Sequence, residues 1–263
     1  LFAALCGYAA DGHKFIPQAM ASGAAAVLCQ VPPEGEGIPY VQVADSRRAL
    51  AVVGGNFYGH PAESMTMVGV TGTNGKTTST YLLKAVLEAR GEKVGLIGTN
   101  QNMIGEEVLP TERTTPESFE LQKLFAQMRD AGCTHVVMEV SSHALYLDRV
   151  YGVPYRVGVF TNLTQDHLDF HKTMEEYCGA KAILFRNCET GVVNAADPWT
   201  PRLLEHAGCK LLSFSSSGTA DIQAENIVLA ADHVAFTAVY KGERASVRVN
   251  IPGHFMVDNA LGV

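Results

Sequence analysis

Hydrophobic and polar positions from residue 65 onward form a repeating pattern of short apolar runs and longer amphipathic stretches. Residues 66–70 and 94–97 are apolar runs with the length of a buried strand, and residues 77–90 between them carry apolar side chains at helical spacing. Strands that alternate with helices form a parallel sheet with right-handed crossovers. The pattern predicts an α/β fold whose main part is a doubly wound, mostly parallel sheet.

The same pattern continues toward the C-terminal end. It predicts strands at residues 135–140, 157–160 and 191–194, and helices at residues 116–131, 174–185 and 200–206. Residues 99–115 are predicted to form a long loop, which in a compact domain usually carries function. Alternating residues at 234–240 and 245–251 predict a β-hairpin.

The first 64 residues mix shorter elements. Strands are predicted at residues 1–6, 24–29 and 40–43, and helices at residues 17–22 and 46–57. The second helix ends near Gly59-His60-Pro61, because proline disfavours a helical conformation at the residue before it. We therefore expect a small N-terminal α/β domain over residues 1–64 and a central domain over residues 65–263.

Composition narrows the classes of function. Of the 263 residues, 47% are hydrophobic, which is enough for one large core and a second, smaller one. The formal net charge of -7 argues against a nucleic-acid partner, since no dense run of Lys or Arg opposes it. The six scattered cysteines form no CxxC pair, which indicates reduced thiols in a cytoplasmic protein. Membrane insertion is not expected either, because no apolar run approaches the ~20 residues of a membrane span.

The stretch at residues 68–78 reads as a buried strand, a glycine-rich turn and the start of a helix. Gly72 and Gly75 allow backbone N–H groups to close around phosphate oxygens, Lys76 supplies a cation, and the Thr77 hydroxyl can bind Mg²⁺. A strict Walker pattern needs another glycine six positions before the lysine, where this chain has a valine. A glycine-rich turn beside a chance Lys-Thr pair is the alternative, but the flanking strand and helix favour a nucleotide site.

Two further strand ends carry candidate ligands. Glu139 ends an apolar strand, so its carboxylate is expected at the sheet edge, where it could complete a Mg²⁺ shell with Thr77 or cap the next helix. His167 and His171 follow another strand with HxxxH spacing, but the glutamate of a zinc protease is missing. Magnesium is therefore favoured over zinc.

Other candidates are weak when taken from pattern alone. Lys181 reads as a solvated helix lysine. Arg149 can fork onto phosphate or carboxylate, and Thr114 and Thr115 can donate hydroxyl groups, but such residues are common in loops.

Taken together, several of these stretches resemble the Mur ligases, ATP-dependent enzymes that form amide bonds in peptidoglycan synthesis. The match is closest to the members that add the third residue of the stem peptide, and it spans most of the chain. The stretches that carry it are Asp11-Gly12, Phe15-Ile16-Pro17-Gln18-Ala19, Gly72-Thr73-Asn74-Gly75-Lys76-Thr77-Thr78, Thr114-Thr115-Pro116, Glu139-Val140-Ser141-Ser142-His143-Ala144-Leu145, Thr161-Asn162-Leu163, Asp166-His167-Leu168-Asp169 and Ala180-Lys181.

The resemblance implies roles for individual residues. ATP would be held by Gly72, Thr73, Asn74, Gly75, Lys76, Thr77 and Thr78, with Asn259 at the adenine. Thr77 and Glu139 would bind one Mg²⁺, and His167 with a carbamylated Lys181 a second, so that Lys76, Lys181 and His167 are the expected catalytic residues. The substrate UDP-MurNAc-L-Ala-D-Glu would contact Thr114, Thr115, Ser141, Arg149, Tyr8, Ala9 and Ala10. The partners would be this substrate and an amino acid, and the protein would be a monomer.

The chain also departs from the family pattern. Leu147 stands where some members have Gln, Arg113 where some have Asn, and Met256 replaces the first Asn of a Phe-Asn-x-x-Asn pattern. The chain begins with Leu1, without an initiator Met or a basic leader. We therefore expect a fragment that lacks the extreme N-terminus and the C-terminal domain, the part that selects the incoming amino acid, diaminopimelate or lysine.

Three alternatives remain from the sequence. A folylpolyglutamate synthetase shares the phosphate loop, but the Thr-Thr-Pro and Ser-Ser-His context speaks against it. A P-loop ATPase or kinase would release or transfer phosphate without an amino-acid acceptor. The fragment alone could bind its ligands without activity, since one substrate's domain would be missing.

Overall fold

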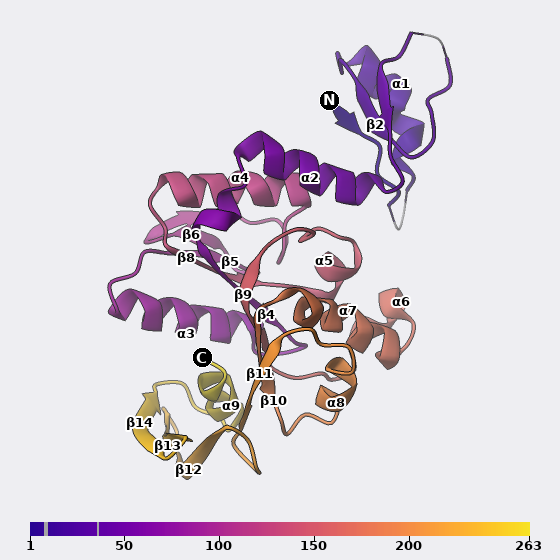
Figure 1. The fold of residues 1–263 in the computed structure, drawn as a ribbon. Coiled ribbons are helices and arrows are strands. Elements are labelled where there is room, and N and C mark those ends of the chain that lie inside the picture. Colours follow the sequence, from indigo (N-terminus) through magenta and orange to yellow (C-terminus); the bar gives the residue numbers. More distant parts are fainter. Residues whose placement is uncertain (8–9, 36) are drawn as a thin grey trace.

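The computed structural model describes residues 1–7, 10–35 and 37–263, and its N-terminal part is a small parallel sheet (Figure 1). The strands, in the order β1-β2-β3, are β1 Phe2–Ala3, β2 Val27–Cys29 and β3 Tyr40–Gln42. The 3-10 turn η1 Gly12–Phe15 and the helix α1 Ile16–Ala21 accompany this sheet, and Ile16 and Val27 share its small core. The predicted mixture of short strands and helices is confirmed here, with shorter strands than expected.

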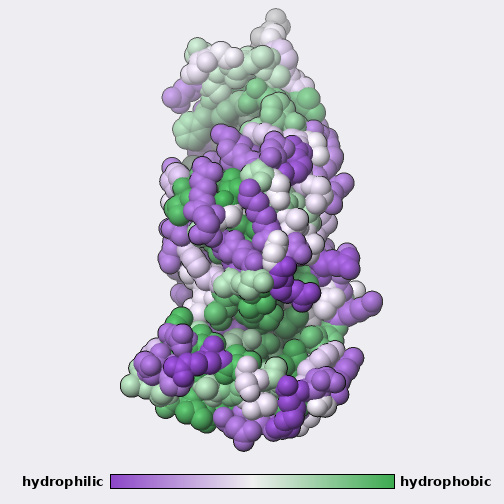
Figure 2. Space-filling view, turned by 90° about the vertical axis from the view of Figure 1, so that its left-hand side faces the viewer, coloured by the Kyte–Doolittle hydropathy of each residue, from purple (hydrophilic) through white to green (hydrophobic). Residues whose placement is uncertain are grey.

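The outer strand of the small sheet stays at the surface. All three residues of β3 are exposed. Figure 2 shows apolar side chains gathered at this end of the molecule, where the exposed apolar residues include Val31, Tyr40 and Val41. The small sheet therefore buries much less apolar surface than the central one.

Helix α2 Ser46–Tyr58 leads from the small sheet to the central part of the molecule. The Asp45 carboxylate caps it by accepting from the Arg47 and Arg48 N–H groups, and Gly59, with φ 68°, ends it in the left-handed conformation. The helix packs along α4 Ser118–Asp130, as Figure 1 shows. The boundary between two domains at residue 64 stays a prediction.

The central part is built on one sheet of eleven strands within the described residues, in the order β14-β13-β12-β11-β10-β9-β4-β8-β5-β6-β7. The strands are β4 Thr66–Thr71, β5 Val94–Ile97, β6 Asn102–Ile104, β7 Glu107–Leu109, β8 His135–Glu139, β9 Tyr155–Phe160, β10 Thr190–Asn194, β11 Lys210–Ser215, β12 Ile222–Leu229, β13 Val234–Tyr240 and β14 Glu243–Val249. All pairs from β12 to β5 are parallel, and antiparallel strands are added at both ends. The predicted doubly wound, mostly parallel sheet is confirmed.

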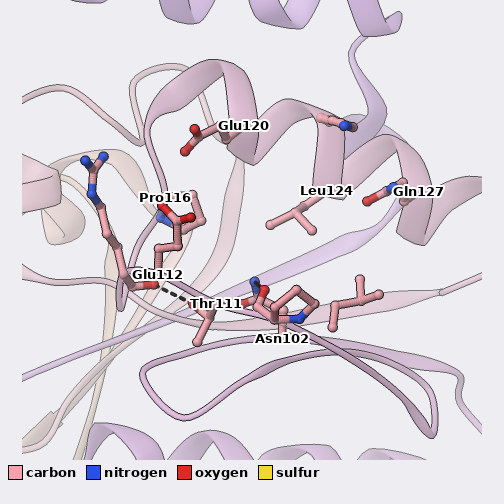
Figure 3. A pocket seen from close by; sticks show the side chains of 11 residues that line it. Asn102, Thr111, Glu112, Pro116, Glu120, Leu124 and Gln127 are labelled. Atoms are coloured by element: carbon pink, nitrogen blue, oxygen red, sulfur yellow. Dashed lines mark hydrogen bonds between the residues drawn. The ribbon is translucent and has the colours of Figure 1, made fainter.

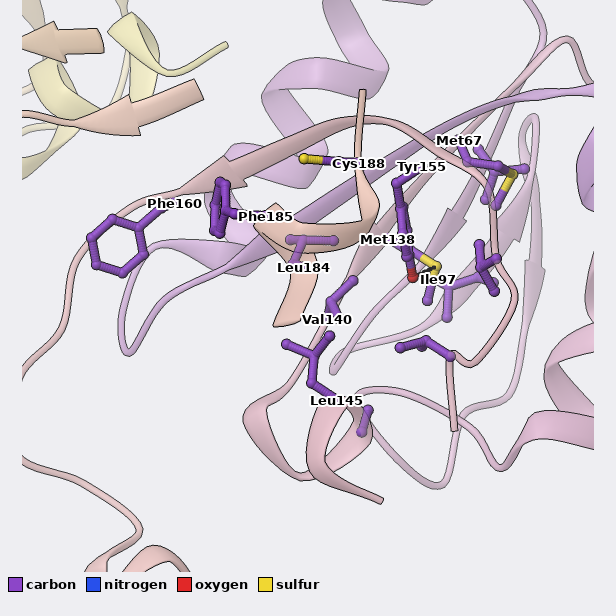
Figure 4. Packing of buried hydrophobic residues seen from close by; sticks show 14 of the residues in the cluster. Met67, Ile97, Met138, Val140, Leu145, Tyr155, Phe160, Leu184, Phe185 and Cys188 are labelled. Atoms are coloured by element: carbon purple, nitrogen blue, oxygen red, sulfur yellow. Dashed lines mark hydrogen bonds between the residues drawn. The ribbon is translucent and has the colours of Figure 1, made fainter. Parts of the chain in front are cut away.

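Helices cover both faces of this sheet, because alternate residues of each buried strand point to opposite sides. The helices are α3 Lys76–Ala89, α4, α5 Ser142–Tyr146, α6 Leu168–His171, α7 Met174–Asn187, α8 Thr200–Leu203 and α9 Phe255–Leu261, with the 3-10 turn η2 Pro61–Ser64 before β4. On one face Met67 and Met138 meet the apolar residues of α4 and α7, as Figure 4 shows for Met138 and Leu184. On the other face Val68 and Val137 meet Leu83 of α3.

The structure differs from the prediction in several elements. Residues 99–115 are not a continuous loop, because β6 and β7 form a short hairpin that extends the sheet beside β5. Strands β11 and β12 and helix α9 were not predicted, since β11 is exposed at its start and α9 has only seven residues. Pro116 lies before the N-cap residue of α4 instead of in its first turn. Within the described part of the chain, no helix is long and apolar enough to cross a membrane.

Candidate active site

The candidate site lies where β4, β8 and β9 end side by side. β4 stands between its two neighbours in the sheet, and the chain leaves it through the loop Gly72–Gly75 into α3. Gly72 has φ 147° and Gly75 has φ 86°, and a Cβ at either would collide with Thr161 or Asn259. Only glycine fits both positions, so the loop backbone passes close to its neighbours. This is the crevice at which open α/β sheets bind ligands.

The first turn of α3 faces this crevice with its N–H groups free of a side-chain cap. Its N-cap residue is Gly75, which offers no side chain. Lys76 folds back over the loop, and its Nζ donates to the Gly72 and Thr73 carbonyl oxygens at 3.0 and 2.9 Å. Burial lowers the pKa of Lys76, while the charge of Glu139 opposes that shift. A helix N-terminus with a partly buried cation beside it binds phosphate well.

Glu139 joins the phosphate loop to the next strand. Its carboxylate is 1% exposed and accepts from the Thr77 hydroxyl at 2.9 Å, from the Thr99 N–H at 3.0 Å and from the Thr99 hydroxyl at 3.0 Å. The Thr99 hydroxyl lies 3.0 Å from that of Thr114. The predicted pair of Thr77 and Glu139 is thus brought together, and it offers the oxygen ligands that Mg²⁺ prefers.

The predicted substrate contacts form a second group beside Glu139. The Thr115 hydroxyl donates to the Glu139 carbonyl at 2.9 Å and accepts from the Ser141 N–H at 3.1 Å. Arg149 Nη1 donates to the Thr115 carbonyl at 3.3 Å. The Ser141 hydroxyl caps α5 by accepting from the Ala144 N–H.

Lys181 is not the solvated lysine that its helical pattern indicates. It is 1% exposed, its Nζ donates to the Gly72 carbonyl at 3.0 Å, and it lies 4.4 Å from the centre of the Tyr177 ring. Burial, followed by the charge of Lys76, lowers the pKa of Lys181 well below its usual range. His167, in the left-handed conformation at φ 52°, also packs against the Tyr177 ring. Both residues therefore lie around one side chain next to the phosphate loop.

Of the remaining predicted residues, some lie at the phosphate loop and one lies beside the small sheet. Asn259 of α9 lies against Gly75, which places it at the loop. Asn74 and Thr73 are held by residues 162 and 164, through bonds to the Asn162 amide and the Thr164 carbonyl. Thr78 lies in the first turn of α3. Ala10 belongs to the loop beside the small sheet, where its carbonyl accepts from the Gly7 N–H. Tyr8 and Ala9 lie outside the described residues.

Two histidines that the sequence pattern left without a specific role pack together beside the site. His171 is 2% exposed, with Nε2 2.9 Å from the Ser142 hydroxyl, and its ring centre is 5.4 Å from that of His143. His143 in turn contacts the ring of His167 at 5.0 Å between centres. The Ser-Ser-His segment and the HxxxH spacing were visible in the sequence, but their contact depends on the fold.

His171 predicts a pH dependence of stability. Burial, followed by the charge of His143, lowers its pKa from 6.5 to about 4. The unfolded chain therefore takes up this proton first as pH falls, so the stability from neutral His171 is complete above pH 6.5 and is lost between 6.5 and 4. The loss is about 3 kcal/mol. We expect His171→Gln to show a flatter decline of Tm over this range in thermal melts, whereas the exposed control His206→Gln keeps the native slope. Equal slopes in the two variants would contradict this.

A cavity of about 380 Å³ lies next to the segment that carries Thr114 and Thr115, and its lining includes Arg113 and Pro116 on either side of that pair (Figure 3). It lies between α4 and the chain around β7, where Glu112, Pro116 and Leu124 point toward it. Arg113, next to Thr114, is part of its wall. The cavity lies beside the Thr114-Thr115 segment, away from the phosphate loop.

Comparisons with known proteins point to one family. Residues 70–263 match the model of the Mur ligase middle domain, and residues 1–58 match the model described as Mur ligase family, catalytic domain. The chain is 49% identical, over 100% of its length, to UDP-N-acetylmuramoyl-L-alanyl-D-glutamate–2,6-diaminopimelate ligase 1 of Clostridium acetobutylicum, and 46% identical to the corresponding ligase of Clostridium botulinum. A solved structure of such a ligase superimposes with a TM-score of 0.86 at 27% identity, covering 99% of this chain and 55% of that one. The chain spans 55% of the length of both curated relatives.

Proposed function

This chain belongs to the Mur ligase family, and from that premise we propose that it is the nucleotide-binding part of an ATP-dependent ligase of peptidoglycan synthesis. The enzyme adds the third amino acid to UDP-MurNAc-L-Ala-D-Glu. The names of the relatives that match the whole chain favour 2,6-diaminopimelate as that amino acid. The observation that carries the proposal is that Glu139 accepts hydrogen bonds both from Thr77, next to Lys76 of the phosphate loop, and from Thr115 of the second group.

In the proposed reaction a carboxylate oxygen of the dipeptide attacks the γ-phosphorus of ATP, and the bond to the β-phosphate bridging oxygen breaks. The resulting acyl phosphate is attacked by the amine of the incoming amino acid, which releases phosphate and a proton. Lys76 and the N–H groups of the first turn of α3 hold the phosphates. Thr115, Ser141 and Arg149 orient the dipeptide, so the protein acts mainly by positioning and by charge neutralisation.

Thr77 and Glu139 fit a resident Mg²⁺. Their oxygen atoms are 2.9 Å apart, and the hydrogen-bond partners of the buried Glu139 carboxylate among the described residues are the uncharged hydroxyl and N–H groups of Thr77 and Thr99. When bound, Mg²⁺ would offset negative charge on the phosphates. The buried carboxylate is thereby explained, since charged groups are rarely buried without a partner of opposite charge.

The buried position of Lys181 suits carbamylation of its side chain. Carbamylation joins the nitrogen of a neutral amine to the carbon of CO₂ and releases a proton, so it needs the uncharged form. Burial and the nearby Lys76 favour that form, because they lower the pKa of Lys181. The carbamate would be an anion that can ligate a hard cation together with His167, which an ammonium group cannot do.

We predict a labile mass increase on Lys181. Native mass spectrometry and crystallography in bicarbonate should find the carbamate on Lys181, while Lys84, which is paired with Glu88 at 2.6 Å, stays unmodified. An unmodified Lys181 under these conditions would refute the second metal site.

The function is tested with the full natural protein that contains this chain. ADP release should require UDP-MurNAc-L-Ala-D-Glu and an amino acid together, with diaminopimelate preferred to lysine. Release without an amino-acid acceptor would favour a P-loop ATPase or kinase, and activity on a folate substrate would favour the folylpolyglutamate alternative. We further propose that the protein acts in the cytoplasm, which its scattered cysteines without a CxxC pair support. We also propose that it is a monomer.

A further inference from the structure

Glu117 is the common partner of three arginines that come from separate parts of the chain. Its Oε2 lies 3.3 Å from Arg47 Nη1 of α2, and its Oε1 lies 2.9 Å from Arg149 Nε and 3.4 Å from Arg113 Nη1. Arg149 bonds to the Thr115 carbonyl, and Arg113 directly precedes Thr114 in the sequence. We call these four residues the Glu117 cluster.

Glu117 stands at the start of α4 without capping it. It is the N-cap residue, a position where Ser, Thr, Asp or Asn side chains commonly accept from the N–H groups of the first turn. Glu117 makes no such cap bond. Its carboxylate contacts the three arginines instead. The orientation of the Glu117 side chain is therefore set by the arginines and not by helix capping.

The Glu117 cluster carries more positive than negative charge. Three guanidinium groups face one carboxylate, and the side chains of Arg47 and Arg149 are only 17% and 16% exposed. Burial lowers the pKa of Arg149, and the charges of Arg113 and Arg47 lower it further, while the charge of Glu117 raises it. Partly buried surplus charge of this kind is costly without an anion.

Arg47 also connects the N-terminal part of the chain with the central part. Its Nε donates to the Cys6 carbonyl at 3.3 Å. Its Nη1 meets Glu117 on the central part. The guanidinium of Arg47 therefore bridges the Cys6 carbonyl and the carboxylate of Glu117.

We propose that Glu117 is a positioning residue that gathers Arg47, Arg113 and Arg149 into one site for an anionic group of the UDP-linked substrate. This inference rests on the proposed function and deepens it. The substrate offers phosphate and carboxylate groups, and bidentate guanidinium groups recognise both. Glu117 keeps the guanidinium groups together before the substrate arrives, and the surplus charge then binds it.

The test uses steady-state kinetics of the full natural protein with ATP, diaminopimelate and UDP-MurNAc-L-Ala-D-Glu. Glu117→Gln keeps the side-chain volume but removes the charge that opposes three guanidinium groups. We expect the KM for the UDP-linked substrate to rise about tenfold, with kcat and the KM for ATP little changed, and the Tm to fall because three guanidinium groups lose their shared carboxylate. Glu117→Asp should recover part of the loss, and Arg47→Gln should raise the same KM. The control Glu120→Gln, an exposed glutamate one turn further along α4, should behave as the native enzyme.

Two results would overturn the inference while the proposed function stands. One is a native KM for the UDP-linked substrate in Glu117→Gln. The other is a parallel rise of the KM values for ATP and for the UDP-linked substrate, which would mean that Glu117 only supports the fold. If the native enzyme does not turn over this substrate at all, the proposed function fails and the inference fails with it.

Discussion

Replacing Lys76 by alanine is expected to lower ATP-dependent turnover by about 10³-fold or more. The ammonium group lies over the phosphate loop, bonded to the Gly72 and Thr73 carbonyl oxygens, where the incoming phosphates would take its bonds. Without it, negative charge on the transferring phosphoryl group lacks its nearest protein cation. ADP release by the full natural protein, measured with both substrates at saturation, checks this loss.

The same variant should keep its fold. Burial already lowers the pKa of Lys76, so the protein pays to hold the charged form there, and the alanine variant should melt at or above the native temperature. A matched control is Lys172→Ala, an exposed lysine outside the phosphate loop, which should retain turnover. Native turnover in Lys76→Ala would refute the role of the loop.

Much of the phosphate-loop region could be predicted because its signals are local. Glycines at 72 and 75, the apolar strand before them and the amphipathic helix after them lie within one stretch of chain, and the observed β4 and α3 begin and end within one residue of the prediction. Glu139 was predictable for a related reason. The ends of parallel strands meet at one sheet edge, so a carboxylate at the end of one strand faces the loop that follows another.

Elements that depend on distant partners could not be predicted in this way. The three-residue strand β6 is held by its pairing with β5, where Gly95 faces Ile104, and nothing in its own residues demands a strand. The buried state of Lys181 is another case, because helical spacing shows which face it lies on but not that Gly72 and Tyr177 cover it. The same holds for the Glu117 cluster, since no local pattern tells which carboxylate Arg47 and Arg149 share.

Glu139 is the second residue at which a single change should have a large effect. In Glu139→Gln the amide keeps the shape of the carboxylate and can still accept from Thr77 and Thr99, so the variant should fold with a Tm close to the native value. The substitution removes one negative charge at the position proposed for Mg²⁺. We expect turnover to fall by about 10²- to 10³-fold, and the Mg²⁺ concentration for half-maximal activity to rise.

A magnesium titration of activity separates this metal role from a purely structural one. If Glu139 only anchored Thr77 and Thr99, Glu139→Gln, whose amide oxygen can accept the same bonds, would keep turnover and the Mg²⁺ requirement close to the native values. If it binds the metal, added Mg²⁺ should recover part of the turnover, because a weaker site fills at higher concentration. The control is Glu88→Gln, which removes a carboxylate from the ion pair with Lys84 on α3 and should leave the titration unchanged. A native Mg²⁺ requirement in Glu139→Gln would therefore exclude this carboxylate as a ligand, even if turnover were low.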